Sequence, residues 1–354
     1  MRSLRRRGRE EPFFSHSASP CVPRFRDSGA GRRSMTNRDR FRRVFAFEPV
    51  DRLPVIEWAP WWDKTIARWR GEGLPEELQD PGDIREYFGQ DCHRQYWIAP
   101  QVCRRVATRD EYIEMKPRLY PEIAFDKEVV RGWAERQKTG EMVVWISLDG
   151  PFWFPRRLFG IEEHLYAFYD QPDLMKEMNE DLLAFNTRIF SEFCEICVPD
   201  FMTFAEDMSY NHGPMLSKAQ FDEFMAPFYR AITPVIHERG TTVLVDTDGD
   251  ITEPAAWFLE VGCDGLLPLE RMAGVDVAEL RRRHPRIRLL GAFDKTVMHL
   301  GEDRMRQEFE RLLPVMRQGG YIPSCDHQTP PGVSIDDYRL YMRLLKEYCG
   351  RAAT

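Results

Sequence analysis

The sequence predicts a single-domain (β/α)8 TIM barrel built around a parallel sheet. From Asn37 onward, short apolar runs typical of buried strands alternate with longer amphipathic stretches typical of helices. Four of these runs end in acid-rich polar residues, and a parallel barrel gathers the carboxyl ends of its strands at one mouth, where its active site lies. The competing fold is a doubly wound open sheet. It normally carries a Gly-rich turn after its first strand, and this sequence has none there.

Each helix or strand is assigned from the spacing of apolar residues along its segment. Pro49 ends the first helix, because proline cannot continue it. The predicted strands are 53–58, 95–99, 142–148, 201–205, 241–245, 265–269, 288–293 and 321–324. The predicted helices are 38–47, 109–118, 126–138, 161–169, 174–197, 218–239, 253–261, 277–284, 303–317 and 335–348, with helix-like context also at 66–69 and 84–88.

Residues 1–34 differ from the rest of the chain, since they hold nine arginines against three acidic residues. This composition cannot build a packed core. We therefore expect either a disordered extension or a start assigned upstream of the true first residue, Met35. An Arg-rich transit peptide is the alternative, and Glu10 and Glu11 interrupt that pattern. The predicted catalytic domain is 35–354.

The totals argue against several classes of protein. A net charge of −7 gives no support to a broad nucleic-acid surface. No apolar run approaches the roughly 18 residues that span a bilayer. Eight cysteines in 354 residues are too sparse for a disulfide scaffold, so we expect a cytoplasmic protein.

The densest acidic group follows the run 241–245. Asp246 and Asp248 would project to the same side if the strand continued through them, and Gly249 permits a tight turn. Paired carboxylates bind hard cations or raise one another's pKa for acid–base work. The alternative is a solvated turn, because Asp and Gly both favour turns.

A second group, Cys325-Asp326-His327, offers a thiol, a carboxylate and an imidazole after the last strand. Cys325 and His327 have the spacing to share a metal, or Asp326 could orient His327 as a general acid or base. The alternative is a buried free cysteine followed by a histidine that caps a loop.

Other strand ends supply candidate catalytic or substrate-binding side chains. Glu206 could act in catalysis or, alternatively, cap the following helix. Aromatic residues could wall a pocket for a flat or apolar ligand, and Arg156 could hold a carboxylate or phosphate. Besides Arg156, the predicted substrate-binding residues are Trp58, Trp153, Asp207, Tyr210, Glu270, Asp294 and Lys295.

An ordered series of short segments resembles the uroporphyrinogen decarboxylase superfamily across roughly residues 36–350. The segments are Asn37–Phe41, Pro49–Val55, Asp149–Phe152, Asp246–Gly249, Gly291–Lys295 and Gly319–Ile322. The resemblance implies a TIM barrel with its site at the mouth, often as a homodimer. The superfamily includes metal-free haem-pathway decarboxylases and zinc-dependent methyltransferases that work with corrinoid proteins.

This chain departs from both branches. The haem-pathway enzymes carry an arginine-containing segment after the first strand, where residues 58–64 here read Trp-Ala-Pro-Trp-Trp-Asp-Lys. The loss disfavours a polyanionic porphyrinogen. The methyltransferases hold zinc with a His-x-Cys pair and a later Cys. By that resemblance Asp246 and Asp248 take the first two positions, and Cys325 keeps the third.

The sequence therefore predicts an enzyme, either a methyltransferase or a carboxy-lyase. In the first hypothesis it transfers a methyl group from a small methylated substrate to a corrinoid partner protein, with Zn²⁺ or another divalent cation at Asp246, Asp248, Cys325 and His327. In the second it decarboxylates a carboxylated substrate by acid–base chemistry of Asp246 or His327. The third is a non-catalytic, ligand-binding barrel.

Overall fold

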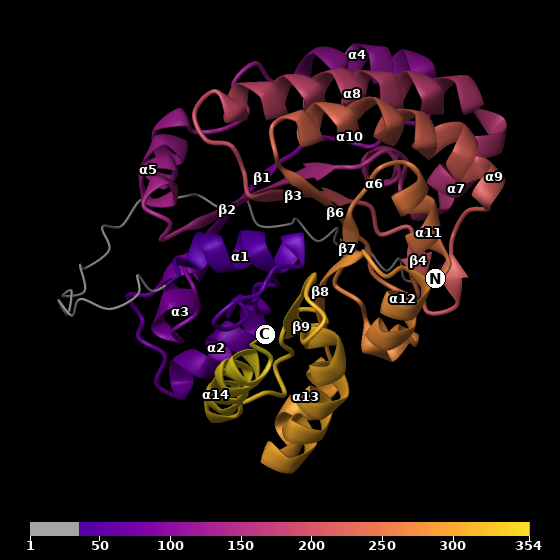
Figure 1. The fold of residues 1–354 in the computed structure, drawn as a ribbon. Helices are drawn as coiled ribbons and strands as arrows, with labels where there is room; N and C mark the ends of the chain where they lie inside the picture. The colour runs from indigo at the N-terminus through magenta and orange to yellow at the C-terminus, as the bar shows by residue number, and fades with distance from the viewer. Residues whose placement is uncertain (1–34, 354) are drawn as a thin grey trace, which may run out of the picture. The chain divides into compact units, whose positions relative to one another are not determined.

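The computed structural model describes residues 35–353, and the segment predicted to be disordered or wrongly assigned, 1–34, lies outside the described residues. Seven strands form one curled, wholly parallel sheet, in the order β1-β2-β3-β6-β7-β8-β9 (Figure 1). Their bounds are β1 His93–Ile98, β2 Val143–Asp149, β3 Phe201–Ala205, β6 Thr242–Asp246, β7 Gly265–Leu267, β8 Arg288–Phe293 and β9 Tyr321–Cys325. The TIM-barrel fold class is confirmed, and β3 and β8 have their predicted bounds.

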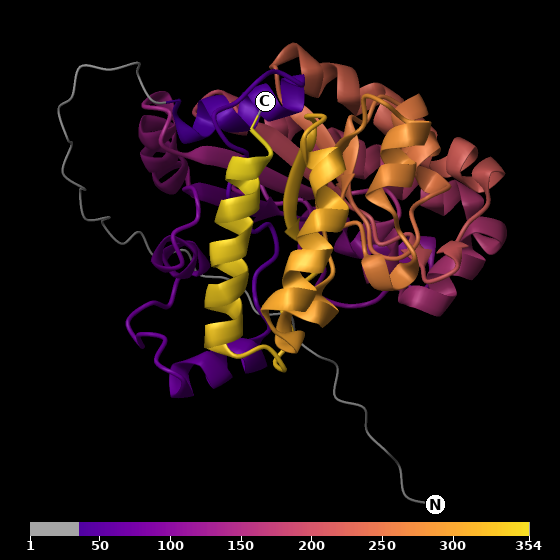
Figure 2. The ribbon, with the colours of Figure 1, turned by 60° about the horizontal axis from the view of Figure 1, so that its bottom comes forward.

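Helices cover the outside of this sheet. The long helices α8 and α10 lie side by side (Figure 1), and α13 and α14 lie together over β8 and β9 (Figure 2). The helices are α1 Asn37–Ala46, α2 Asp63–Gly71, α3 Pro81–Tyr87, α4 Arg109–Leu119, α5 Lys127–Lys138, α6 Trp153–Phe159, α7 Ile161–Asp170, α8 Pro172–Cys194, α9 Lys218–Gln220, α10 Ala226–Glu238, α11 Pro254–Glu260, α12 Val277–Arg283, α13 Glu302–Met316 and α14 Ile335–Arg351.

Most predicted elements differ from the observed ones by a few terminal residues, and two are interrupted or cut short by the backbone. The helix predicted over 218–239 is interrupted by a π-helical turn, Phe221–Met225, between α9 and α10. The strand predicted over 265–269 ends at Leu267, because the next residue, Pro268, has no N–H to donate to a neighbouring strand. No helix within residues 35–353 combines the length and apolarity needed to cross a membrane.

The predicted first strand, 53–58, is wrong as a strand. The segment contacts both edges of the sheet, but no regular ladder forms along it. Pro54 lacks an N–H, and the Val55 N–H is used by the Asp91 carboxylate at 2.9 Å. One backbone bond remains on this side, from the Asp91 N–H to the Val55 carbonyl at 2.8 Å. The eighth barrel position is therefore held mainly by side chains.

Glu57 makes the contact with β9 on the other side of this segment. Its side chain is 1% exposed and accepts hydrogen bonds from the Ser324 hydroxyl, from the Cys325 N–H at 3.0 Å and from the Tyr341 hydroxyl at 2.9 Å. The Trp58 indole N–H also donates to the Cys325 carbonyl at 2.6 Å. Burial raises the pKa of Glu57 to about 7, although the three hydrogen bonds act in the opposite direction.

The Glu57→Ala variant should lose about 3 kcal/mol or more of unfolding free energy, because it leaves three buried donors without an acceptor. Urea denaturation monitored by tryptophan fluorescence measures this loss. Glu48→Ala removes an exposed glutamate nearby and should change stability by less than about 0.5 kcal/mol. Equal effects of the two substitutions would contradict the role of Glu57 in closing the barrel.

Candidate functional site

The carboxyl ends of β3, β6, β7 and β9 bring five polar residues together at the mouth, which we call the mouth cluster: Asp207, Asp246, Asp248, Glu270 and His327. The Asp248 N–H donates to Asp207 at 3.4 Å, and His327 Nε2 lies 3.3 Å from an Asp248 carboxylate oxygen. The structure thus assembles residues that the sequence placed separately after four strands.

The turn after β6 shapes this cluster. Gly249 has a φ of +82°, and a Cβ there would lie 2.6 Å from the backbone nitrogen of Tyr210. Its N–H donates to Glu270 at 3.0 Å, and the neighbouring Asp250 N–H donates to the Tyr210 carbonyl at 2.9 Å. Glycine is therefore required where the turn after β6 packs against the loop after β3.

Like charges and burial raise the pKa values of two acids in the cluster. Burial, followed by the charges of Asp207 and Asp248, raises the pKa of Asp246 well above its usual range. Burial and the Asp248 charge likewise raise the pKa of Asp207, against the opposing charge of Arg156. The Asp246 carboxyl accepts no hydrogen bond from any residue in the part of the chain that the structure describes. Both carboxyls therefore hold a proton more tightly than a solvated aspartate does.

His327 is paired with Asp248. Burial lowers the pKa of His327, but the hydrogen bond and charge of Asp248 outweigh that effect, so its pKa is raised overall. The indole of Trp58 lies edge-on to the imidazole, with ring centroids 6.3 Å apart. His327 is therefore held in place, and it binds a proton more tightly than a solvated imidazole does.

The structure changes the predicted metal-ligand set. Asp248, Glu270 and His327 each offer a ligand atom, and these atoms lie within 4.8 Å of one another. Asp246 and Cys325 do not belong to this group, so the four-residue set is not assembled. The sequence prediction assumed that the strands continue, so that Asp246 and Asp248, and likewise Cys325 and His327, would point to the same side. However, β6 ends at Asp246 and β9 ends at Cys325, and the strand alternation stops there.

Cys325 is a core residue. Its side chain is fully buried, and burial, with the nearby charges of Glu57 and Asp326, raises its pKa well above the usual range. Its backbone N–H and carbonyl bind Glu57 and Trp58. Its sulfur also lies outside the group of ligand atoms that Asp248, Glu270 and His327 form.

Asp326 and Lys295 lie beside the mouth cluster. Asp326 is fully buried and accepts the N–H groups of Arg271 at 3.0 Å and Lys295 at 3.1 Å. Lys295 Nζ lies 3.4 Å from Asp326 and 3.3 Å from Glu270. Burial raises the pKa of Asp326 to about 6. Lys295 is therefore the cation that joins the end of β8 to the mouth cluster.

Glu206 is held away from the mouth cluster. Its side chain is fully buried and accepts the N–H groups of Phe152 at 2.9 Å and Trp153 at 3.1 Å, together with the Tyr229 hydroxyl. Burial raises its pKa to about 8. Glu206 thus anchors the start of α6. The sequence had suggested instead that it could cap the helix that follows it in the chain.

Asp294 caps a short helix. It accepts the Thr296 N–H at 2.8 Å and the Thr296 hydroxyl at 2.6 Å, at the start of the 3₁₀ helix Lys295–Leu300. Both side-chain contacts are local, within two residues of Asp294. Its geometry fits a structural cap more closely than the substrate-binding role that the sequence suggested.

Aromatic and basic residues lie around the mouth. The Arg156 guanidinium lies 5.1 Å from the Trp153 ring centroid and donates to the Asp207 carbonyl at 2.8 Å. Trp58 is 7% exposed, whereas Tyr210 is 50% exposed in the hairpin formed by β4 Ser209–Tyr210 and β5 Gly213–Pro214. Trp153 and Tyr210 are therefore the accessible aromatic candidates, and Trp58 supports His327.

Sequence reasoning missed two buried carboxylates near the mouth. Asp149 ends β2 and lies 2.5 Å from Arg157, with a longer contact of 3.4 Å from the Trp97 indole N–H. Its position after an apolar run was the same signal used for the other acids. Glu57 lies within an apolar run, so nothing in the pattern separated it from a strand residue.

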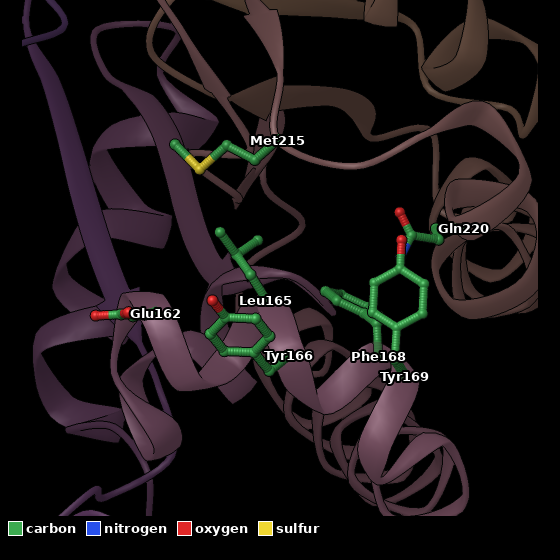
Figure 3. Close-up of a pocket in the computed structure, with 7 residues that line it drawn as sticks. All are labelled: Glu162, Leu165, Tyr166, Phe168, Tyr169, Met215 and Gln220. Atoms are coloured by element: carbon green, nitrogen blue, oxygen red, sulfur yellow. The ribbon is translucent and has the colours of Figure 1, made fainter.

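A separate hollow of about 270 Å³ lies between α7 and the segment 215–220 (Figure 3). Its lining includes Leu165, Tyr166 and Tyr169 of α7 and Met215 from the facing segment. None of the predicted site residues lines it, so the polar chemistry and this hollow are different features of the surface.

The chain belongs to the uroporphyrinogen decarboxylase family, whose model matches residues 84–348. No curated protein sequence matches it. Among solved structures, it is similar to a methyltransferase from Methanosarcina mazei, with a TM-score of 0.63 and 14% identity, over 89% of this chain and 99% of the other. That likeness shows the shared fold. A weaker likeness, with a TM-score of 0.41 and 10% identity, is to a structure from a study of two fungal β-1,4-galactanases, over 82% of this chain and 99% of that one.

The raised pKa of Glu206 predicts a pH-dependent stability. The folded state binds this proton more tightly than the unfolded chain, whose pKa is near 4.5. The stability that the proton contributes is therefore complete below about pH 4.5 and is lost as the pH rises toward about 8. In the wild-type protein this fall in unfolding free energy should be on the order of a few kcal/mol. We expect the fall to be absent in Glu206→Gln, and urea denaturation across this pH range measures it. Glu253→Gln, at an exposed glutamate, should leave the loss unchanged, and an unchanged slope in Glu206→Gln would contradict the assignment.

The ligand geometry predicts which substitutions weaken cation binding. Glu270→Gln should weaken Mn²⁺ or Zn²⁺ binding at least about tenfold, because it removes one of the two carboxylates in this group of three residues. Cys325→Ser should leave affinity within about twofold if the buried thiol is not a ligand. Isothermal titration of each purified variant measures both effects. Weaker cation binding in Cys325→Ser, with unchanged binding in Glu270→Gln, would instead support the metal-ligand set predicted from the sequence.

Proposed function

We propose that this protein is a methyltransferase that takes a methyl group from a small methylated substrate and passes it to a corrinoid held by a partner protein. The observation that carries the proposal is the convergence at the mouth of the Asp207 and Asp246 carboxyls, whose pKa values are raised, with the Asp248–His327 pair. The corrinoid partner follows from the family resemblance.

In this reaction the bond between the methyl carbon and a heteroatom of the substrate breaks, and a new bond forms between that carbon and the acceptor. The acceptor supplies the electron pair for the new bond, while the heteroatom keeps the pair of the old bond. A heteroatom that leaves a neutral substrate with this pair needs a proton, which a positioned general acid supplies. Asp246 is the candidate donor, because its pKa is raised and its carboxyl has no competing hydrogen bond from the described residues.

His327 and Asp248 have a supporting role. Their 3.3 Å contact fixes the imidazole, and the raised pKa of His327 keeps a proton near the acids, which regain from solvent the proton that each turnover consumes. Trp153 and Tyr210 provide apolar surface for the substrate near these groups. Binding, orientation and proton supply are therefore assigned to different side chains.

The charges at the mouth favour a neutral or cationic substrate. Four carboxyls belong to the mouth cluster, and its two nearest cations are already engaged. Lys295 pairs with Glu270 and Asp326, while Arg156 binds the Asp207 carbonyl. A substrate carboxylate would therefore have to draw Lys295 or Arg156 away from its present partner before it could form an ion pair there.

The donor set fits an oxygen- and nitrogen-bound cation better than a thiolate-bound zinc. Asp248, Glu270 and an unprotonated His327 would hold such a cation in place of the His327 proton, whereas Cys325 lies outside their group. A divalent cation bound there would act as a Lewis acid toward the substrate heteroatom. The roles given above to Asp246 and to the aromatic residues do not depend on it.

Decarboxylation is the second candidate. The same protonated carboxyls could protonate the carbon from which carbon dioxide departs, which is the observation in its favour. It would require Arg156 or Lys295 to leave its present partner and hold the substrate carboxylate. Release of carbon dioxide from carboxylated substrates, without a corrinoid, would support this reaction instead of methyl transfer.

Asp246→Asn should reduce the methyl-transfer rate by about 10²–10⁴-fold, because the amide cannot supply the proton. The assay mixes purified protein with methylated amines, ethers and thioethers and a corrinoid protein, and follows the visible spectrum of the corrinoid. Asp250→Asn is the matched control: its carboxylate accepts the Thr252 N–H at 3.0 Å in the same loop, outside the mouth cluster.

Full activity in Asp246→Asn would remove Asp246 from the mechanism. If the wild-type protein neither transfers methyl groups nor releases carbon dioxide across these substrates, the ligand-binding barrel becomes the better account.

A further inference from the structure

A second hollow, of about 580 Å³, lies at the end of the barrel opposite the mouth. It is lined by Phe47, which follows α1, and by Arg281, Arg282 and Arg286, at the end of α12 and in the turn before β8. Its volume is within the range of ordinary small-molecule sites. The mechanism proposed above uses none of these residues.

Arg281 is a buried cation with no acidic partner. It is 5% exposed, and its guanidinium donates to the carbonyls of Gly319 at 2.7 Å and Ile287 at 3.0 Å. Its Nε is buried without any hydrogen-bond partner, and no carboxylate of residues 35–353 forms an ion pair with it. Backbone carbonyls satisfy hydrogen bonds but leave the positive charge uncompensated, which is costly away from water.

A second arginine adds to this positive charge. Arg286 has neither an ion pair nor a hydrogen bond among the described residues, and its guanidinium lies 4.0 Å from the Phe47 ring centroid. Arg281 lies 5.0 Å from the same centroid. Burial, followed by the charge of Arg286, lowers the pKa of Arg281 to about 10. The nearby acid Glu279 is already paired with Arg282 and with Arg283.

The backbone that presents Phe47 is strained. Phe47 has a φ of +61°, which is unfavourable for a bulky residue. Its ring packs so closely on Gly320 that a Cβ there would lie 2.1 Å from Phe47 Cζ. This left-handed conformation forms the C-cap of α1, where the Phe47 N–H donates to the Val44 carbonyl at 3.0 Å. Phe47 and the buried Arg281 are therefore fixed by their surroundings, and the exposed Arg286 lies over the same aromatic ring.

We propose that this hollow binds a small phosphate-bearing anion, with Arg281 and Arg286 as its main contacts and Arg282 at its edge. Guanidinium groups bind phosphate oxygens through paired hydrogen bonds, and a bound anion would neutralise the charge that the protein leaves unpaired. The position at the amino-terminal ends of β8 and β9 separates this site from the mouth. Its occupant is therefore distinct from the methylated substrate.

Inorganic pyrophosphate is the probe, titrated into the whole protein at fixed ionic strength, with calorimetry and thermal unfolding as readouts. We expect one site per chain and a rise in melting temperature. Arg286→Gln should bind at least about tenfold more weakly, because an exposed charged contact is lost without disturbing the core. Arg281→Gln should also bind pyrophosphate at least about tenfold more weakly. If loss of this buried arginine prevents folding, the exposed Arg286→Gln still tests the proposal.

Arg283→Gln is the matched control, since Arg283 lies on the same helix, is exposed, pairs with Glu279 and does not line the hollow. It should retain pyrophosphate affinity within about twofold. The proposal is overturned if the wild-type protein gives no binding. It is equally overturned if Arg283→Gln and Arg286→Gln weaken binding to the same extent, which would indicate a nonspecific basic surface.

Discussion

Curling a parallel sheet into a barrel forces the carboxyl ends of its strands together, and the rest of this molecule depends on that constraint. The sheet closes between β9 and β1, where residues 53–58 make side-chain contacts instead of a regular ladder. Glu57 carries much of that closure through Ser324, Cys325 and Tyr341. The same contacts fix the end of β9, from which Asp326 and His327 continue.

Once the strand ends converge, acids from separate strands are too close to remain charged independently. Burial raises the cost of ionising Asp207 and Asp246, and the charge of Asp248 adds to that cost for both. The result is a mouth that favours bound protons or cations over further negative charge. This property connects the fold to the proposed chemistry, because a proton held by Asp246 is available where a leaving heteroatom would form.

The sequence predicted features that depend on local pattern and failed on those that depend on contacts across the chain. The strands β3 and β8 and the acids at their ends follow from short apolar runs. Residues 53–58 have the same pattern, yet Pro54 and the buried carboxylate of Glu57 prevent a regular ladder. Asp248, Glu270 and His327 come from the ends of three different strands. Residue spacing along the sequence therefore could not show that these three side chains group together without Cys325.

The most direct test of this account is the protonation state of Asp246 in the folded protein at pH 7. Infrared spectroscopy resolves the carbonyl stretch of a protonated carboxyl, and a difference spectrum between the wild-type protein and Asp246→Asn isolates one residue. The account predicts that a protonated-carboxyl band disappears in Asp246→Asn and persists in Asp250→Asn. An Asp246 difference spectrum that contains only ionised-carboxylate bands at pH 7 would contradict it.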